Sequence, residues 1–235
     1  MPFIELEALC YQREDWQLKA AFNLERGECL AVIGPSGAGK STLLSLIAGF
    51  ERLISGSIRI NGRDYTTAEP ADRPVTSLFQ EHNLFAHLSV KKNVGLGRDP
   101  GLRLNQKDHL AIDQALEAVG LSGYHHRLPE SLSGGERQRV ALARCLCREH
   151  PLMLLDEPFA ALDPALRSEM RGLIHQLIKS HDLTVIMVSH HPDEAAEIAS
   201  SGIFLHQGEL KAKGVMSDLL NNPQLPLLRA YLGVS

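Results

Sequence analysis

One glycine-rich stretch constrains this chain more than any other feature of its sequence. It follows an apolar run at residues 29–33 and precedes a second apolar run that starts at Leu43. The stretch consists of Gly34, Pro35, Ser36, Gly37, Ala38, Gly39, Lys40, Ser41 and Thr42. This order predicts a strand, a tight turn and a helix, which is the setting of a phosphate-binding P-loop. Glycines let successive backbone N–H groups point at phosphate oxygens, and the positive end of the next helix attracts the same anion. The stretch therefore predicts a site for a nucleoside triphosphate.

Two side chains in the stretch carry specific chemistry. Lys40 is long enough to reach the outer phosphates, and the Ser41 hydroxyl is placed to bind Mg²⁺. The alternative is an ordinary glycine-rich turn with a lysine beside it. The complete match to the P-loop pattern, with its flanking apolar runs, favours nucleotide binding over that alternative.

The composition excludes several classes of protein. The net charge of −4 argues against a nucleic-acid binder, whose domain is normally basic. No apolar stretch reaches the length of a membrane span, and the acidic start lacks the basic segment of a signal peptide. The four cysteines have neither zinc-like nor redox-motif spacing. We expect a cytosolic protein that contacts a membrane only through a partner.

Two acids follow the apolar run at residues 152–155. Asp156 and Glu157 end what reads as a buried parallel strand, where negative charge is costly unless a cation compensates it. Mg²⁺ beside a phosphate would do so. We expect Asp156 to hold the metal and Glu157 to polarise the attacking water, with a structural helix cap as the alternative.

Polar side chains also follow two other expected strands. Gln80 comes after residues 75–79, and His190 comes after residues 183–188. Open α/β sheets bind ligands at the carboxyl ends of their strands. Gln80 is thus placed to meet the metal or the attacking water, and His190 to contact a γ-phosphate or orient that water. A lone glutamine is ordinarily a surface residue, so only its position at the end of a strand supports a functional role for Gln80.

A second candidate anion site lies at residues 133–136, before a helix expected over 137–147. Its members are Ser133, Gly134, Gly135 and Glu136. Backbone N–H groups and the helix dipole would point at a docking anion there. The alternative is a simple serine N-cap with a flexible entry. Two phosphate-type helix starts in one chain of this size favour the anion site.

The remaining patterns outline an α/β fold. Alternating residues 3–24 predict an antiparallel hairpin, and Asn105 with Asp108 predicts a helix cap. Residues 84–148 read as an inserted helical segment between two parts of an α/β core, 1–83 and 149–235. Residues 203–205, with a turn at Gly208, predict the last strand before a tail of short helices broken by Pro223 and Pro226. Tyr11, on the rim of the hairpin, could equally stack on an adenine or be a half-buried strand residue.

Taken together, these motifs resemble the ATP-binding subunits of ABC transporters along essentially the whole chain. The resemblance implies a P-loop NTPase (RecA-like) core with an N-terminal antiparallel β-subdomain and an inserted α-helical subdomain. It assigns Gln80 to the Q-loop, residues 132–136 to the signature, Asp163 to the D-loop and His190 to the switch histidine. It also implies that Tyr11 stacks on the adenine. Glu136 departs from the usual glutamine; we expect slightly weaker dimer closure, with Gln138 compensating in part.

The resemblance also implies partners and a mechanism. Two copies would pack head to tail as a homodimer, so that the signature of one closes over the Mg²⁺ and ATP held by the P-loop of the other. Residues 81–87 would meet an integral membrane permease at the cytoplasmic face of the bacterial inner membrane. A periplasmic or extracellular solute-binding protein would act indirectly, and no nucleic acid is implied.

Finer resemblances point to an importer. The runs at 79–90, 93–97 and 100–102 are similar to the ATPases of bacterial thiamine importers, which implies thiamine or its phosphates as the solute. Iron, polyamine, sulfate or amino acid uptake stays open, because the permease and binding protein select the solute. A soluble ABC ATPase acting on nucleic acid or ribosomes is a further alternative. A non-hydrolysing module conflicts with intact Lys40, Asp156, Glu157 and His190.

Overall fold

A mixed β-sheet runs through the molecule, and its parallel half places the candidate residues. The computed structural model describes residues 1–78, 84–160 and 162–234. In these residues the sheet has ten strands, in the order β5-β4-β1-β2-β10-β9-β3-β8-β7-β6. The strands are β1 (Ile4–Arg13), β2 (Trp16–Leu24), β3 (Cys29–Ile33), β4 (Ser55–Ile60), β5 (Arg63–Asp64), β6 (Val75–Leu78), β7 (Leu152–Asp156), β8 (Thr184–Val188), β9 (Ser201–His206) and β10 (Glu209–Val215).

Strands β9, β3, β8, β7 and β6 are mutually parallel. Every residue of β3 and β8 is buried, as expected for central strands covered on both faces. The carboxyl ends of parallel strands lie at one edge of the sheet, so the segments that follow β3, β7 and β8 meet there. This arrangement confirms the buried parallel strands predicted around the P-loop and the acidic pair.

The other half of the sheet is antiparallel. β1 and β2 form the predicted hairpin, and β4 and β5 extend it. The expectation that residues 203–205 form the last strand is wrong, because β10 follows and pairs antiparallel with β9. The reversal is a tight turn at Gln207 and Gly208, whose φ angles of 48° and 76° are left-handed. β10 also pairs with β2 at a single position, which joins the two halves of the sheet.

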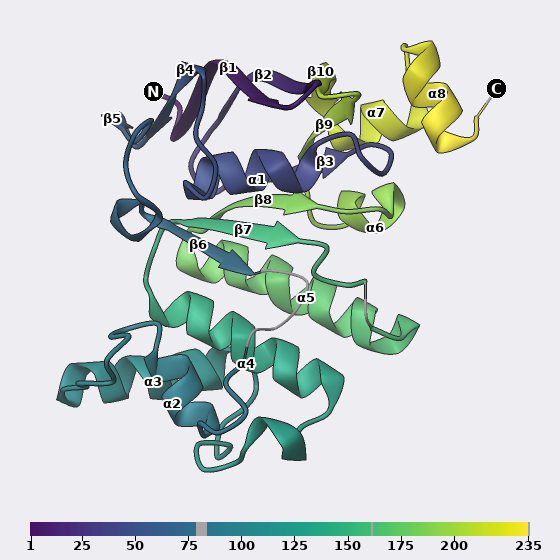
Figure 1. The fold of residues 1–235 in the computed structure, drawn as a ribbon. Helices are drawn as coiled ribbons and strands as arrows, with labels where there is room; N and C mark the ends of the chain where they lie inside the picture. The colour runs from purple at the N-terminus through teal and green to yellow at the C-terminus, as the bar shows by residue number, and fades with distance from the viewer. Residues whose placement is uncertain (79–83, 161, 235) are drawn as a thin grey trace.

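Helices cover both faces of the parallel strands (Figure 1). They are α1 (Lys40–Ala48), α2 (Val90–Gly95), α3 (Gln106–Ala118), α4 (Gly134–Cys147), α5 (Pro164–His181), α6 (Pro192–Ala196), α7 (Met216–Asn221) and α8 (Pro226–Leu232), with 3₁₀ turns at Pro70–Asp72 and Pro129–Ser131. α1 lies between the parallel strands and the β1–β2 hairpin, whereas α4 and α5 lie on the opposite face. Alternate residues of β3 and β8 accordingly enter two separate hydrophobic clusters.

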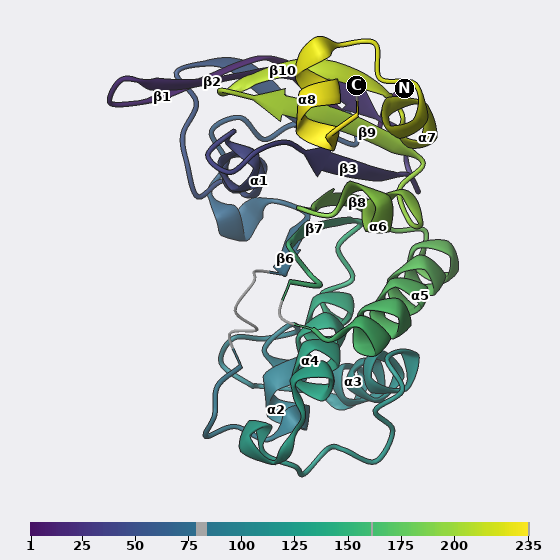
Figure 2. The same ribbon diagram turned by 90° about the vertical axis from the view of Figure 1, so that its right-hand side faces the viewer.

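The segment between β6 and β7 is helical in its described residues, 84–148. Asn105 caps α3, and Asp108 completes the capping box, as predicted. α2, α3 and α4 gather at the end of the molecule opposite the antiparallel strands (Figure 2). Their buried side chains share one hydrophobic cluster with the facing side of the sheet. The division into a core of 1–83 and 149–235 with an insert of 84–148 stays a prediction.

The tail ends in two short helices. Pro226 occupies the first turn of α8 instead of breaking it, because the helix start needs no N–H from that residue. Leu228 is buried, and the Tyr231 ring lies 5.5 Å from the ring of Phe204 on β9. Within the described residues, no helix combines the length and apolar character needed to cross a membrane.

Candidate functional site

The glycine loop joins β3 to α1 as predicted, and its backbone needs its glycines. Gly34, Gly37 and Gly39 have φ angles of 149°, 77° and 101°. A Cβ on Gly34 would lie 2.1 Å from the carbonyl oxygen of Leu205, and one on Gly39 would lie 2.8 Å from the ring of Trp16. Gly39 is also the N-cap of α1 and brings no capping side chain. The first turn of α1 is therefore open to an anion.

Lys40 is buried at the mouth of this loop, with only 5% of its surface exposed. Its ammonium group donates to the carbonyl oxygens of Gly34 at 2.8 Å and Pro35 at 3.0 Å. Burial lowers the pKa of Lys40, and the nearby charges of Glu157 and Asp156 oppose that shift. The lysine thus points into the loop, where phosphate oxygens can replace the two carbonyls as its acceptors.

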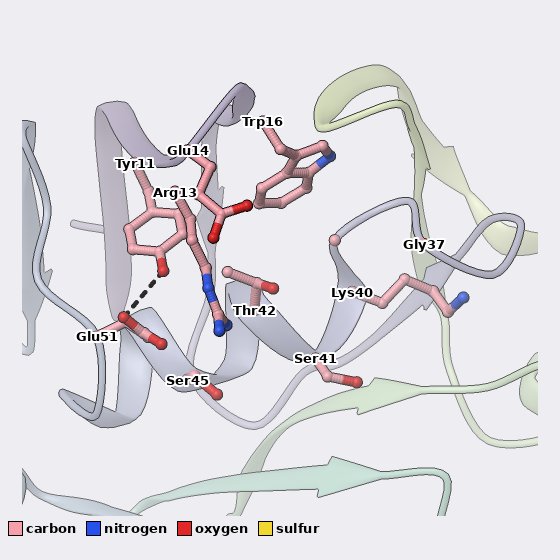
Figure 3. Close-up of a pocket in the computed structure, with 11 residues that line it drawn as sticks. Tyr11, Arg13, Glu14, Trp16, Gly37, Lys40, Ser41, Thr42, Ser45 and Glu51 are labelled. Carbon is pink, nitrogen blue, oxygen red and sulfur yellow. Dashed lines mark hydrogen bonds between the residues drawn. The ribbon is translucent and has the colours of Figure 1, made fainter.

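A cavity of about 560 Å³ opens beside the start of α1 (Figure 3). Its size lies within the range of small-molecule sites. It is lined by Tyr11, Arg13, Glu14, Trp16, Gly37, Gly39, Lys40, Ser41, Thr42, Ser45 and Glu51. The glycine loop supplies anion-binding groups on one side, and the β1–β2 hairpin supplies aromatic rings on the other. This division matches a ligand with a phosphate chain at one end and a flat ring at the other.

The two aromatic residues differ in what they offer a ligand. Tyr11 is only 6% exposed, and its hydroxyl donates to Glu51 Oε2 at 2.9 Å. Trp16 is partly exposed, packs edge to face against Tyr11, and contacts Gly39 directly. Sequence reasoning missed Trp16. The available signal was a lone tryptophan beside an otherwise polar hairpin tip, a few residues from the candidate Tyr11.

The predicted metal ligands meet at the end of β7. The Ser41 hydroxyl on α1 donates to Asp156 Oδ1 at 3.1 Å. Burial raises the pKa of Asp156, and the Ser41 hydrogen bond and the charge of Lys40 oppose the rise. A hydroxyl and a carboxylate oxygen fit Mg²⁺, which commonly takes one or two protein ligands together with phosphate oxygens and water. Gln80, the third predicted ligand, lies outside the described residues.

Glu157 and His190 also come together, although they follow different strands. His190 Nε2 lies 2.7 Å from Glu157 Oε1. The backbone N–H of Glu157 donates to the carbonyl oxygen of Val188 at 3.1 Å, which ties the end of β7 to β8. Glu157 has a left-handed φ of 50°, a strained conformation that costs about 1 kcal/mol or more and is enriched at functional sites. The pair lies beside the P-loop, because Glu157 directly follows Asp156, whose carboxylate accepts from the Ser41 hydroxyl.

The signature segment forms a helix N-cap, and α4 begins at Gly134 instead of the expected 137. The Ser133 hydroxyl accepts from the backbone N–H of Glu136 at 3.2 Å, and Glu136 Oε2 accepts from the N–H of Ser133 at 2.7 Å. This bond to Ser133, with a further one from Tyr124, lowers the pKa of Glu136. The unusual carboxylate is therefore engaged with the first turn of its own helix. A Cβ on Gly134 would touch nothing within 4 Å, so this helix start is sterically open.

Three further contacts hold the signature helix and the D-loop in place. The buried Gln138 side chain donates to the carbonyl of Pro158, so it is not available at the surface to compensate for Glu136. Gly135 packs against Leu166, where an added Cβ would lie 3.0 Å from that side chain. Asp163 caps α5 by accepting from two backbone N–H groups at 3.0 and 3.1 Å.

The structure does not bring the two candidate anion sites together within one chain. Among the described residues, the lining of the P-loop cavity includes none of residues 132–136 and not Asp163. Lys40, Ser41, Asp156, Glu157 and His190 form one group at the carboxyl edge of the parallel strands. The signature forms a separate, open helix start.

Comparisons with known proteins agree with this geometry. The family model described as "ABC transporter" matches residues 18–160. The thiamine import ATP-binding protein ThiQ of Photobacterium profundum is 47% identical, over 98% of this chain and 99% of its own length. ThiQ of Brucella suis is 54% identical, over 88% of this chain and 86% of its own. A solved structure of CbiO1 from Clostridium perfringens, part of the ABC transporter complex CbiONQ, has a TM-score of 0.86 and 27% identity, covering 94% of this chain and 91% of its own.

Proposed function

Because this chain belongs to the ABC transporter family, whose ATP-binding subunits hydrolyse ATP, we propose that it drives the import of thiamine or its phosphates through a separate permease. Two relatives of 47 and 54% identity that match most of the chain are thiamine import ATP-binding proteins, and this supports the solute assignment. The gathering of Lys40, Ser41, Asp156, Glu157 and His190 at one edge of the sheet carries the catalytic assignment.

Each residue at this edge has a distinct part in hydrolysis. Lys40 turns from the two loop carbonyls to the outer phosphates and offsets their charge. Ser41 and Asp156 would hold Mg²⁺, which neutralises charge on the phosphate oxygens when it is bound. Glu157 accepts the proton of the attacking water. His190 contacts the Glu157 carboxylate and holds it in orientation.

The base binds on the aromatic side of the cavity. Trp16 presents the more accessible ring and forms the main stacking surface, while Tyr11 packs against it edge to face and keeps its hydroxyl on Glu51. This assignment shifts the stacking role from Tyr11, where the family resemblance puts it, to its neighbour.

The active form is a head-to-tail homodimer. In the described residues, the P-loop cavity lacks any wall from the signature, while Ser133 lies exposed on an open helix start. A second copy supplies Ser133, Gly134 and Gly135 to the nucleotide, with Asp163 beside the same interface. ATP therefore joins the two copies, and its hydrolysis releases them.

Transport requires a membrane partner. The permease docks near residues 81–87, of which 81–83 lie outside the described residues, and Phe85 offers an apolar side chain that is 50% exposed. A solute-binding protein delivers thiamine to the permease on the other side. The chain thus works at the cytoplasmic face of the bacterial inner membrane.

The experiment is to reconstitute the chain with its permease in liposomes and to measure ATP hydrolysis against binding protein loaded with thiamine. We expect the thiamine-loaded protein to stimulate hydrolysis and labelled thiamine to enter the vesicles. Matched runs with sulfate, iron, a polyamine or an amino acid test the alternatives. Uptake of one of these in place of thiamine would refute the solute, and a wild-type protein without ATPase activity would refute the function.

A further inference from the structure

Two arginines lie one turn apart on α5 and face α6. Arg167 lies 3.3 Å from Glu194 Oε1, and Arg171 lies 3.6 Å from Glu194 Oε2 and 2.8 Å from Glu197 Oε2. Both guanidinium groups and Glu194 are partly buried, so solvent and salt screen this network less than a surface ion pair.

Arg167, unlike Arg171 among the described contacts, also binds a backbone carbonyl. Its Nε donates to the carbonyl oxygen of Leu162 at 2.9 Å. That carbonyl belongs to the segment that leaves Glu157 and leads to Asp163, the N-cap of α5. A guanidinium has donors in a rigid planar fork, so one side chain can bind the carbonyl and Glu194 together.

Glu194 connects the same arginine to His190. α6 starts at Pro192, two residues after His190, and Ser189 bridges the turn between them by hydrogen bonds to the backbone of His191. Glu194, His190 and Glu157 also line one small cavity of about 90 Å³. The position of Glu194 therefore constrains the position of the His190 turn.

These contacts close a ring. Glu157 touches His190, the chain runs from His190 to Glu194, and Glu194 binds Arg167. Arg167 in turn binds Leu162, from which the chain runs back to Glu157. Two segments that follow different strands are thus joined at the catalytic pair and again at Arg167.

We propose that Arg167 is a positioning residue that fixes Glu157 and His190 relative to each other by holding the segments after β7 and β8 together. The proposal rests on the ATPase function proposed above. Arg167 does not line the P-loop cavity, so it is assigned no direct contact with the reacting groups. It acts by keeping His190 in contact with the Glu157 carboxylate, so that this carboxylate stays oriented to accept the proton of the attacking water. Small displacements of catalytic groups reduce rates steeply.

The test compares Arg167→Ala with Arg171→Ala in the full-length protein. Both variants remove a guanidinium that binds α6, but only the first removes the contact with Leu162. We expect Arg167→Ala to lower kcat by about ten-fold while KM for ATP changes less than about two-fold. Arg171→Ala should leave kcat within about two-fold. Arg167→Lys keeps the charge without the planar fork, so it should restore kcat only in part.

Further measurements separate positioning from folding. Thermal unfolding of the three variants reports stability, and Arg167→Lys provides the kinetic readout if Arg167→Ala does not fold. Adding Glu194→Gln to Arg167→Ala should lower kcat no further, since the two residues act as one link. Equal losses of kcat in Arg167→Ala and Arg171→Ala, or a full return of kcat in Arg167→Lys, would overturn the proposal. A wild-type protein that hydrolyses no ATP would overturn the function and this inference with it, whereas an active wild type with an unaffected Arg167→Ala overturns the inference alone.

Discussion

The starts of α1 and α4 are both helix N-termini, and in the homodimer proposed above they would supply opposite halves of one nucleotide site. Each follows a small-residue turn and presents backbone N–H groups at a helix N-terminus. The start of α1 has Gly39 as its N-cap, a buried Lys40 and a cavity of about 560 Å³ beside it. The start of α4 has a serine cap, a capping box and an exposed Ser133. The start of α1 thus borders a cavity that can take a ligand, whereas the start of α4 is an exposed surface that would reach a ligand only in the proposed homodimer.

The difference lies in what surrounds each helix start. The backbone N–H of Gly208 donates to the carbonyl oxygen of Ala38 at 3.1 Å, and Trp16 packs on Gly39. The signature helix is held by the hydrogen bond from Gln138 to the carbonyl of Pro158 and by the packing of Gly135 on Leu166. Nothing lies within 4 Å of a Cβ built on Gly134, so this side of the helix start stays uncovered. Two helix N-termini that can both attract anions therefore differ in their settings: one borders a cavity beside a buried lysine, and the other is an exposed helix start.

Glu157→Gln should have the largest effect on ATP hydrolysis, and the substituted residue belongs to the P-loop site beside α1. The amide cannot take a proton from water, so we expect kcat to fall by about 10² to 10⁴-fold while ATP binding is retained. The intact signature should then trap a nucleotide-bound dimer, visible by size-exclusion chromatography with ATP. ATP turnover at the wild-type rate would contradict the general-base assignment.

Lys40→Ala should abolish most nucleotide binding without touching α4. Loss of charge-assisted hydrogen bonds of about 1.5–3 kcal/mol weakens binding by about 10- to 100-fold. Equilibrium dialysis with labelled ATP measures this directly, and unchanged affinity would exclude the phosphate role of Lys40.

Ser133→Ala tests the other side. Loss of the N-cap costs about 1 kcal/mol of stability, and loss of a hydroxyl donor to phosphate should lower kcat by about ten-fold with ATP affinity of the monomer unchanged. Mixing this variant with Lys40→Ala protein sharpens the comparison. A head-to-tail heterodimer contains one intact composite site, so the mixture should hydrolyse ATP faster than either variant alone. A mixture no faster than the better of the two variants would argue against sites shared between copies.

Trp16→Ala should weaken ATP binding by about five-fold through the lost stacking surface, whereas Tyr11→Phe should change it less than two-fold. GTP and ATP affinities measured in parallel show whether the base is the part affected. Tyr11→Phe removes only the hydroxyl bonded to Glu51, so the result that would return the stacking role to Tyr11 is a larger loss of ATP affinity in Tyr11→Ala than in Trp16→Ala.

Glu136→Gln should have the smallest effect on activity at neutral pH, within about two-fold, because a glutamine oxygen can also accept from the N–H of Ser133. The variant differs in acid. The pKa of Glu136 is lowered in the folded protein, so its stabilising contribution is complete at neutral pH and is lost as the pH falls through that lowered pKa. The melting temperature of the wild type should therefore fall more steeply with decreasing pH than that of the variant. Parallel curves of melting temperature against pH would show that the Glu136 carboxylate does not contribute to stability.

Local patterns in the sequence were sufficient for the parallel strands and the residues that follow them. Runs such as 152–155 end in charged residues that only the edge of a sheet accommodates, so Asp156 and Glu157 were placed correctly at the end of β7. The capping box of Ser133 and Glu136 is also written locally, as a serine followed three residues later by a glutamate. Contacts across the fold were not accessible in this way. β10 alternates exposed and half-buried residues where the two halves of the sheet meet, so it lacks the apolar pattern of a buried strand. The contacts of Trp16 with Gly39 and of Arg167 with Leu162 leave no recognisable spacing pattern in the sequence.

The place of β3 in the sheet has a consequence for synthesis. Its two neighbours, β8 and β9, are supplied by residues 184–206, and the carbonyl oxygen of Ala38 accepts a hydrogen bond from the N–H of Gly208. Translation must therefore pass residue 206 before the strand that leads into the glycine loop can have its partners on both sides. A chain that stops before residue 184 would carry the complete glycine loop but would lack both neighbouring strands of β3 and the bond from Gly208 to Ala38.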